Sequence, residues 1–234
     1  KGYVRGISLS NNGLEGSLPN EIGNFPGLRT INMSWNALTG SIPTTVSSLN
    51  DLLTLRLHNN QLDGTIPESL GTLTKLGILS LSQNDLVGEI PASLGALVDL
   101  VYLFLDGNQL TGEIPSSLGQ LQRLWMLGLG SNRLTGSIPP ELGDMPNLIS
   151  LNLSFNFLTG EIPLSLGNLR PTLSITLRMN CLNLGNVEAI TAALPAGVDF
   201  FYSNQNHCIV DPPDLRSTFF EVVEESLDWV NPIT

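Results

Sequence analysis

The chain has 234 residues and a formal net charge of −11, with 41% hydrophobic and 13% charged residues. Nucleic-acid binding needs a basic stripe that so acidic a chain lacks, so we expect no nucleic-acid partner. No apolar run approaches the roughly 20 residues of a membrane-spanning helix, so we expect no membrane insertion within this chain.

One unit of 24 residues is repeated along most of the chain. Its clearest copy, residues 100–123, reads LVYLFLDGNQLTGEIPSSLGQLQR. A fixed period of this length is typical of solenoids, in which each repeat stacks on its neighbours. Asparagine marks the period at intervals of 24, at Asn12, Asn36, Asn60, Asn84, Asn108, Asn132, Asn156, Asn180 and Asn204.

Each position of the unit has a physical role. Leu103 and Leu105 alternate with outward-facing residues, which is the pattern of a half-buried strand. Asn108 follows that strand, where its side-chain amide can bond backbone groups of a neighbouring coil. Pro115 has a fixed φ and suits the start of a short helical turn. The unit therefore predicts a strand and a helical turn in every coil, with the asparagines forming a structural ladder.

The copies follow one another without a break until the C-terminal quarter. The first spans residues 4–27, and full copies begin at residues 28, 52, 76, 100, 124 and 148. The copy that begins near residue 172 keeps its strand, but residues 187–194 predict a longer helix. Residues 198–204 predict a last degenerate strand with Phe201 and Asn204 still in phase. We expect a solenoid of about eight copies over residues 1–184, and a degenerate last repeat with a cap over residues 185–234.

The C-terminal segment predicts one further helix. The sequence Asp-Pro-Pro-Asp at residues 211–214 is a typical helix start, and apolar residues follow at helical spacing from Leu215 to Val230. The opposite face is acidic, and from Glu188 onward the chain has eight acidic residues and one basic residue. We interpret this helix as a cap over the open end of the solenoid, and a partner-binding amphipathic helix is the alternative.

The pattern L-x-x-L-x-L-x-x-N-x-L-x-G-x-I-P-x-x-L-G-x-L resembles the plant-type leucine-rich repeat over roughly residues 4–184. The resemblance implies an α/β solenoid, a right-handed superhelix with a parallel concave sheet. Members of this family include plant receptor-kinase ectodomains and polygalacturonase-inhibiting proteins, so it also implies an extracellular or cell-surface setting. The cysteine-bearing cap that usually precedes the first repeat is absent, so we expect either a fragment or an end covered by another surface.

Cys181 and Cys208 are the only cysteines. They would lie on adjacent coils within bridging reach, so a disulfide is our first interpretation, and two buried free thiols are the alternative. A metal site needs more ligands than these two and His207, so we expect no metal. Two glycosylation signals place Asn32 and Asn152 at outward-facing positions of the sheet.

Little in the sequence favours catalysis. The two histidines, His58 and His207, lie nearly the full solenoid apart, so no Ser–His–Asp or Cys–His set can be assembled from them. The glycines follow the repeat period, as turn residues do, and no phosphate-binding loop is present. We therefore expect neither an enzyme nor a cofactor.

Outward-facing residues 24 apart lie side by side, because neighbouring strands are about 4.8 Å apart. Large apolar residues thus meet in the middle of the array, and Gly128 and Gly130 beside them are expected to leave open space. Apolar side chains aimed at water indicate a binding patch, and ordinary cross-strand packing is the alternative. The predicted ligand-binding residues are Ile78, Tyr102, Phe104, Asp106, Trp125 and Met126, flanked by Arg56, His58, Trp35 and Phe155.

These observations predict a non-catalytic recognition module that binds a protein or peptide on its concave sheet. One alternative is an intracellular, cytoplasmic scaffold or the recognition part of a larger multidomain protein. Another is a carbohydrate binder in which Tyr102, Phe104 and Trp125 stack on sugar rings.

Overall fold

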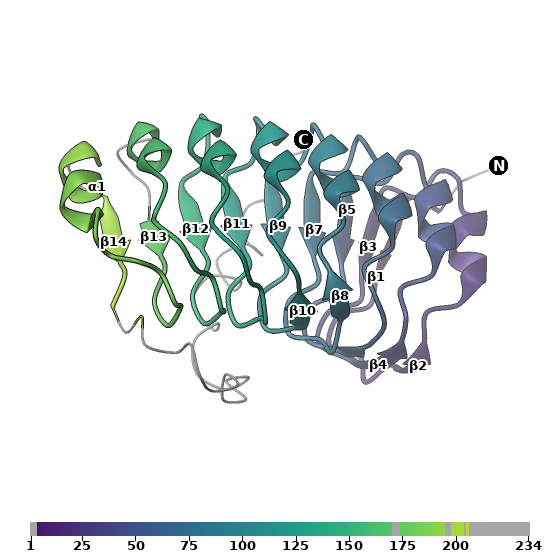
Figure 1. Cartoon of the computed structure of the whole chain (residues 1–234). Coiled ribbons are helices and arrows are strands. Elements are labelled where there is room, and N and C mark those ends of the chain that lie inside the picture. The colour runs from purple at the N-terminus through teal and green to yellow at the C-terminus, as the bar shows by residue number, and fades with distance from the viewer. Residues whose placement is uncertain (1–3, 170–173, 195–197, 204, 206–234) are drawn as a thin grey trace.

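The structure, a computed structural model, describes residues 4–169, 174–194, 198–203 and 205. Its coils stack side by side in a row from the N-terminal end to α1 and β14 (Figure 1). Strands line one side of the row and short helices another. This confirms the predicted α/β solenoid with a parallel sheet.

Nine strands form one parallel sheet, with one strand from each coil. From β1 to β13 the register is offset by 24 residues at every step, so that Ile78 pairs with Tyr102 and Tyr102 pairs with Met126. Each position of the repeat therefore forms a column across the sheet. The strands are, in spatial order, β1 (Gly6–Ser8), β3 (Thr30–Asn32), β5 (Thr54–Arg56), β7 (Ile78–Ser80), β9 (Tyr102–Phe104), β11 (Met126–Gly128), β12 (Ser150–Asn152), β13 (Ser174–Thr176) and β14 (Asp199–Phe201).

Short 3₁₀ helices occupy the second half of the coils. A proline precedes each of them in an extended conformation, for example Pro115 with φ −63° and ψ 127°. Its fixed φ sets the chain direction at the helix start. The helices are η1 (Asn20–Asn24), η2 (Thr44–Ser48), η3 (Glu68–Thr72), η4 (Ala92–Ala96), η5 (Ser116–Gln120), η6 (Pro140–Asp144) and η7 (Leu164–Asn168).

Two minor sheets are built from short segments that follow a strand of the main sheet and precede the next 3₁₀ helix along the chain. The sequence did not predict them. One contains β2 (Glu15–Ser17), β4 (Ala37–Gly40) and β6 (Gln61–Leu62), and the other contains β8 (Val87–Glu89) and β10 (Gln109–Thr111). The glycine of the repeat lies in these strands or just after them and has a left-handed conformation, as at Gly112 with φ 76°. Side chains are strained at such an angle, which explains the glycine.

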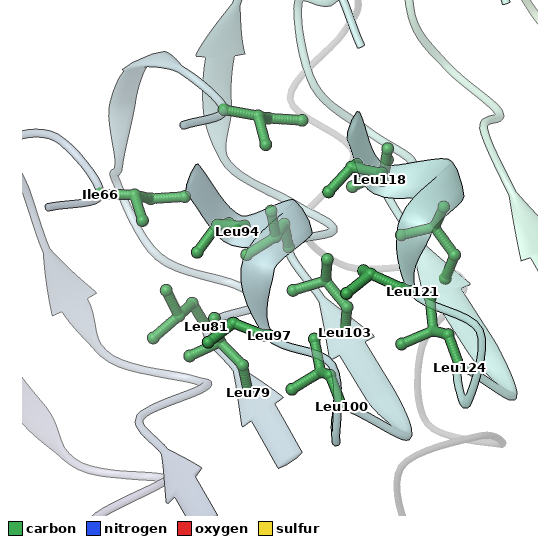
Figure 2. Close-up of a cluster of buried hydrophobic side chains, with 14 of the residues drawn as sticks. Ile66, Leu79, Leu81, Leu94, Leu97, Leu100, Leu103, Leu118, Leu121 and Leu124 are labelled. Atoms are coloured by element: carbon green, nitrogen blue, oxygen red, sulfur yellow. The ribbon is translucent and has the colours of Figure 1, made fainter. Parts of the chain in front are cut away.

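Leucine side chains fill the interior of the row. Figure 2 shows Leu79 and Leu103 from the strands gathered with Leu94 and Leu118 from the helices, and all four are fully buried. This single core continues through successive coils from Leu18 to Ile190. Removing one such side chain typically costs about 2–5 kcal/mol, so the leucine pattern dominates stability.

The asparagines bridge neighbouring coils. In Asn132, Oδ1 accepts a hydrogen bond from Leu110 N at 3.0 Å, while Nδ2 donates to the carbonyls of Leu105 and Leu129 at 3.0 and 3.1 Å. The same pattern holds from Asn36 to Asn180. Each side chain thus satisfies buried backbone groups in two coils at once.

The last coil departs from the period, and the expectation that Phe201 stays in phase is wrong. Phe201 pairs with Thr176, an offset of 25 residues, so it faces outward, with Arg178 lying 4.5 Å above its ring. Asn204 lies outside the described residues. Gln205 makes the ladder contacts instead, accepting from Leu182 N at 3.2 Å and donating to Leu177 O at 2.8 Å.

Helix α1 (Val187–Ala193) replaces the 3₁₀ helix in the last coil and packs on η7. Its Ile190 is fully buried and ends the leucine core. The second predicted helix, residues 211–230, lies outside the described residues. Within the described part of the chain, no helix is long and apolar enough to cross a membrane.

Replacing a central ladder asparagine should lower the free energy of unfolding more than replacing a terminal one. In Asn132→Ala the buried partners of the amide are left unpaired, which typically costs about 3 kcal/mol or more for several groups. Asn12 is exposed and its side chain donates to Ser10 O, so Asn12→Ala should cost below about 1 kcal/mol. Urea unfolding measures both, and equal losses would contradict the ladder's role.

Candidate ligand-binding face

The concave face is the side of the main sheet turned away from the leucine core. In β9, Leu103 points into that core, so Tyr102 and Phe104 on either side of it point the other way. Their columns contain small or polar residues towards the ends of the array, such as Thr30 and Ser150. The bulky apolar residues on this face therefore lie outside the leucine core.

Ile78, Tyr102 and Phe104 form a second apolar cluster, with Val101 and Met126 packed against it. We call these five residues the concave cluster. The rings of Tyr102 and Phe104 are stacked, with centroids 6.2 Å apart and an interplanar angle of 13°. Trp125 meets Tyr102 edge to face at 6.4 Å. Five predicted ligand-binding residues thus lie together across three adjacent coils: Ile78, Tyr102, Phe104, Trp125 and Met126.

The prediction that these side chains point into open water is wrong for three of them. Ile78, Tyr102 and Phe104 are only 7%, 3% and 6% exposed. Ring stacking and cross-strand packing contribute to this burial. Burial also raises the pKa of the Tyr102 hydroxyl, an effect that the charge of Arg56 opposes. Trp125, at 45% exposed, is the accessible aromatic side chain of the group.

Asp106 has a structural role that the sequence did not reveal. Its Oδ1 accepts hydrogen bonds from Gly130 N at 2.9 Å and from Asn152 Nδ2 at 3.0 Å, and the side chain is buried. A Cβ at Gly128 would collide with its carboxylate, and a Cβ at Gly130 would lie 2.7 Å from Asn152 Nδ2. These glycines therefore make room for the Asp106–Asn152 pair, which corrects the expectation of open space.

Both glycosylation candidates have side chains engaged in hydrogen bonds. Asn32 Oδ1 accepts from Ser34 N at 3.2 Å and from Ser34 Oγ at 2.7 Å. Asn152 Oδ1 accepts from Ser154 N at 3.1 Å while its Nδ2 bonds Asp106. A glycan attached to Asn152 Nδ2 would have to share that nitrogen with the bond to Asp106.

His58 is buried beside β7, where its Nδ1 lies 2.9 Å from Ser80 Oγ. This Ser–His pair was missed because the two residues belong to different repeat positions. Burial, and secondarily the charge of Arg56, lowers the pKa of His58 from 6.5 to about 4. The ring is therefore neutral at pH 7, and Ser80 is itself buried, so the pair is a packing contact of the concave face.

The remaining predicted residues lie around the cluster or away from it. Trp35 contacts His58 edge to face with ring centroids 6.5 Å apart. Trp35 and Phe155 occupy the same turn position, each with φ 56°, five coils from one another. A single small ligand cannot contact both, so only an extended partner could use them together.

Cys181 takes part in a disulfide, and Cys208 lies outside the described residues. In the part of the chain that the structure describes, no group of three His, Cys, Asp or Glu residues could hold a metal ion.

Acid should destabilise the protein partly through His58. Its folded-state pKa of about 4 lies below the ordinary 6.5, so its contribution is complete above pH 6.5 and is lost as the pH falls towards 4. Each unit of the difference is worth about 1.4 kcal/mol. The free energy of unfolding of wild type should therefore fall more steeply over this range than that of His58→Gln. Parallel curves for the two proteins would rule this out.

Comparison with known proteins agrees with this architecture. The profile of the family described as Leucine Rich Repeat matches residues 3–25, 27–49, 51–73, 75–97, 99–121, 123–145 and 147–169. A search of curated proteins found no match.

Several solved structures are similar to this chain. One is the leucine-rich repeat ectodomain of the plant membrane receptor kinase GASSHO1/SCHENGEN3 from Arabidopsis thaliana, in complex with CASPARIAN STRIP INTEGRITY FACTOR 2. It is 33% identical with a TM-score of 0.76, and the match covers 85% of this chain and 26% of that one. Another is the Arabidopsis receptor kinase HAESA in complex with the peptide hormone IDA and the co-receptor SERK1. It is 39% identical with a TM-score of 0.74, over 82% of this chain and 33% of that one.

This chain thus spans about a quarter to a third of the length of these two receptors. The repeat match extends over more than half of the chain, and the similar structures are plant receptor ectodomains. The chain belongs to the leucine-rich repeat family, in its plant type.

Proposed function

We propose that the chain is a non-catalytic recognition module that binds a peptide or protein ligand on its concave face. The observation that carries this proposal is the concave cluster, an apolar group on the sheet face that the leucine core does not use. Trp125 stands exposed at its edge, and clustered aromatic residues are frequent centres of binding energy. The sheet supplies a rigid support, because every strand is hydrogen-bonded to its neighbours.

The similar structures support a peptide or protein as the ligand. The HAESA ectodomain is in complex with a peptide hormone and a co-receptor, and the plant peptide hormone receptor RGFR1, 34% identical over 86% of this chain and 36% of its own, is in complex with RGF2. The carbohydrate alternative finds no such support. By the same comparison we infer an extracellular or cell-surface location, which a disulfide at Cys181 favours over the cytoplasmic alternative.

Trp125→Ala should weaken peptide binding without unfolding the protein. Peptides would be selected on the wild-type chain from a phage-displayed library of random dodecapeptides, and their affinities would be measured by calorimetry. Loss of an aromatic side chain that contacts the ligand closely typically weakens binding about tenfold or more. Trp125 is largely exposed, so the midpoint of thermal unfolding should change little.

Phe25→Ala is the matched control. Phe25 is 40% exposed and follows η1 on the helical side of its coil, far from the concave cluster. It should leave the affinity unchanged. If no peptide bound the wild type, or if both variants weakened binding alike, the proposed function would be wrong.

A further inference from the structure

A pocket of about 470 Å³ lies at the edge of the concave face, beside the starts of β7, β9 and β11. This volume is within the range of about 300–1,000 Å³ that is usual for ligand pockets. Its lining includes the aromatic residues Tyr102 and Trp125 and the charged residues Lys75, Asp99 and Arg123. The pocket therefore lies between the concave cluster and a row of charged side chains.

Gly77 lines this pocket and adds no side chain to it. It belongs to a column with Leu53 and Val101, to which it is linked by hydrogen bonds from Gly77 N to Leu53 O and from Val101 N to Gly77 O, both of 2.8 Å. A Cβ added at Gly77 would meet backbone oxygens at 3.5 and 4.0 Å, which are ordinary contacts. At Gly119, by contrast, a Cβ would lie 2.6 Å from Glu141 O. Neither close packing nor a left-handed φ requires the glycine at position 77.

The charges on the rim are already paired with one another. Lys75 Nζ lies 2.7 Å from Asp51 Oδ1, and an Arg123 guanidinium nitrogen lies 2.7 Å from Asp99 Oδ1. Their signs alternate from coil to coil along one column, so a charged ligand group would meet both signs and gain little. An uncharged apolar side chain would gain contact with the wall of Leu53, Val101 and Trp125.

We propose that this pocket binds an uncharged apolar side chain, of leucine or phenylalanine size, from a polypeptide ligand. The inference rests on the proposed function and adds the chemistry of one ligand residue and the place where it binds. Ile78, Tyr102 and Trp125 belong both to the pocket wall and to the group of apolar residues on the concave face. A peptide bound on that face can therefore place one of its side chains in the pocket at the edge of the sheet.

The test uses capped amino acids as probes and the amide spectrum of the ¹⁵N-labelled full chain. N-acetyl-leucine methylamide and N-acetyl-phenylalanine methylamide should shift the Gly77 amide and Trp125 indole signals in a saturable manner. The aspartate and lysine counterparts should not do so at the same concentration. In Gly77→Leu the new side chain occupies the pocket, so the affinity for the apolar probes should fall about tenfold or more.

Gly6→Leu is the matched control. Gly6 lies in β1 at the other end of the sheet, and a Cβ there meets nothing closer than Thr30 Cβ at 3.8 Å. It should leave probe binding unchanged, and both variants should keep the wild-type unfolding midpoint. If Gly77→Leu did not fold, Gly77→Ala would serve, with a several-fold loss expected.

Several results would overturn the inference. One is undiminished binding of the apolar probes by the Gly77 variant, and another is an equal response to the charged probes. A third is a shift of the Gly77 signal on dilution of the protein alone, since a second copy of the chain would then fill the pocket. If selected peptides depended on Trp125 but were insensitive to Gly77→Leu, only this inference would fall. If no peptide bound the wild type at all, the proposed function would fail instead.

Discussion

The side-chain hydrogen bonds between neighbouring coils are the constraint on which the rest of the structure depends. From Asn36 to Asn180, each ladder asparagine binds backbone groups of its own coil and of the coil before it, as Asn84 does with Leu57 O and Leu81 O at 3.1 and 3.0 Å. Most of these groups are buried, and leaving them unpaired would cost free energy. The ladder therefore holds the coils in one register, and the leucine core supplies most of the stabilising free energy.

A fixed register turns the repeat into columns, so changes at one repeat position act together in space. Three adjacent coils carry Ile78, Tyr102 and Met126 at one outward position, and these residues form most of the concave cluster. One column away, Gly77 interrupts a row of larger side chains and leaves a pocket at the same edge. Both features lie outside the leucine core.

The 24-residue period of the sequence predicted the features that depend on the local residue pattern. It did not predict the features that depend on side-chain contacts between coils. The strands, the helical turns after each proline and the columns follow from positions such as Leu103 and Pro115. The burial of Tyr102 and the Asp106–Asn152 bond were not predictable, because they depend on side-chain directions in coils 24 to 46 residues apart. The last coil was placed one residue out of phase, since its degenerate segment offers no leucine marker to show an offset of 25.

Amide hydrogen exchange is the most direct test of the ladder. The backbone amides of Leu86, Leu110 and Leu134 donate to the side-chain oxygens of Asn108, Asn132 and Asn156 at 3.0 to 3.1 Å. If the ladder holds the coils in register, these three amides should exchange slowly and with one common free energy of opening, close to that of global unfolding. Exchange as fast as that of amides in exposed turns would contradict the account.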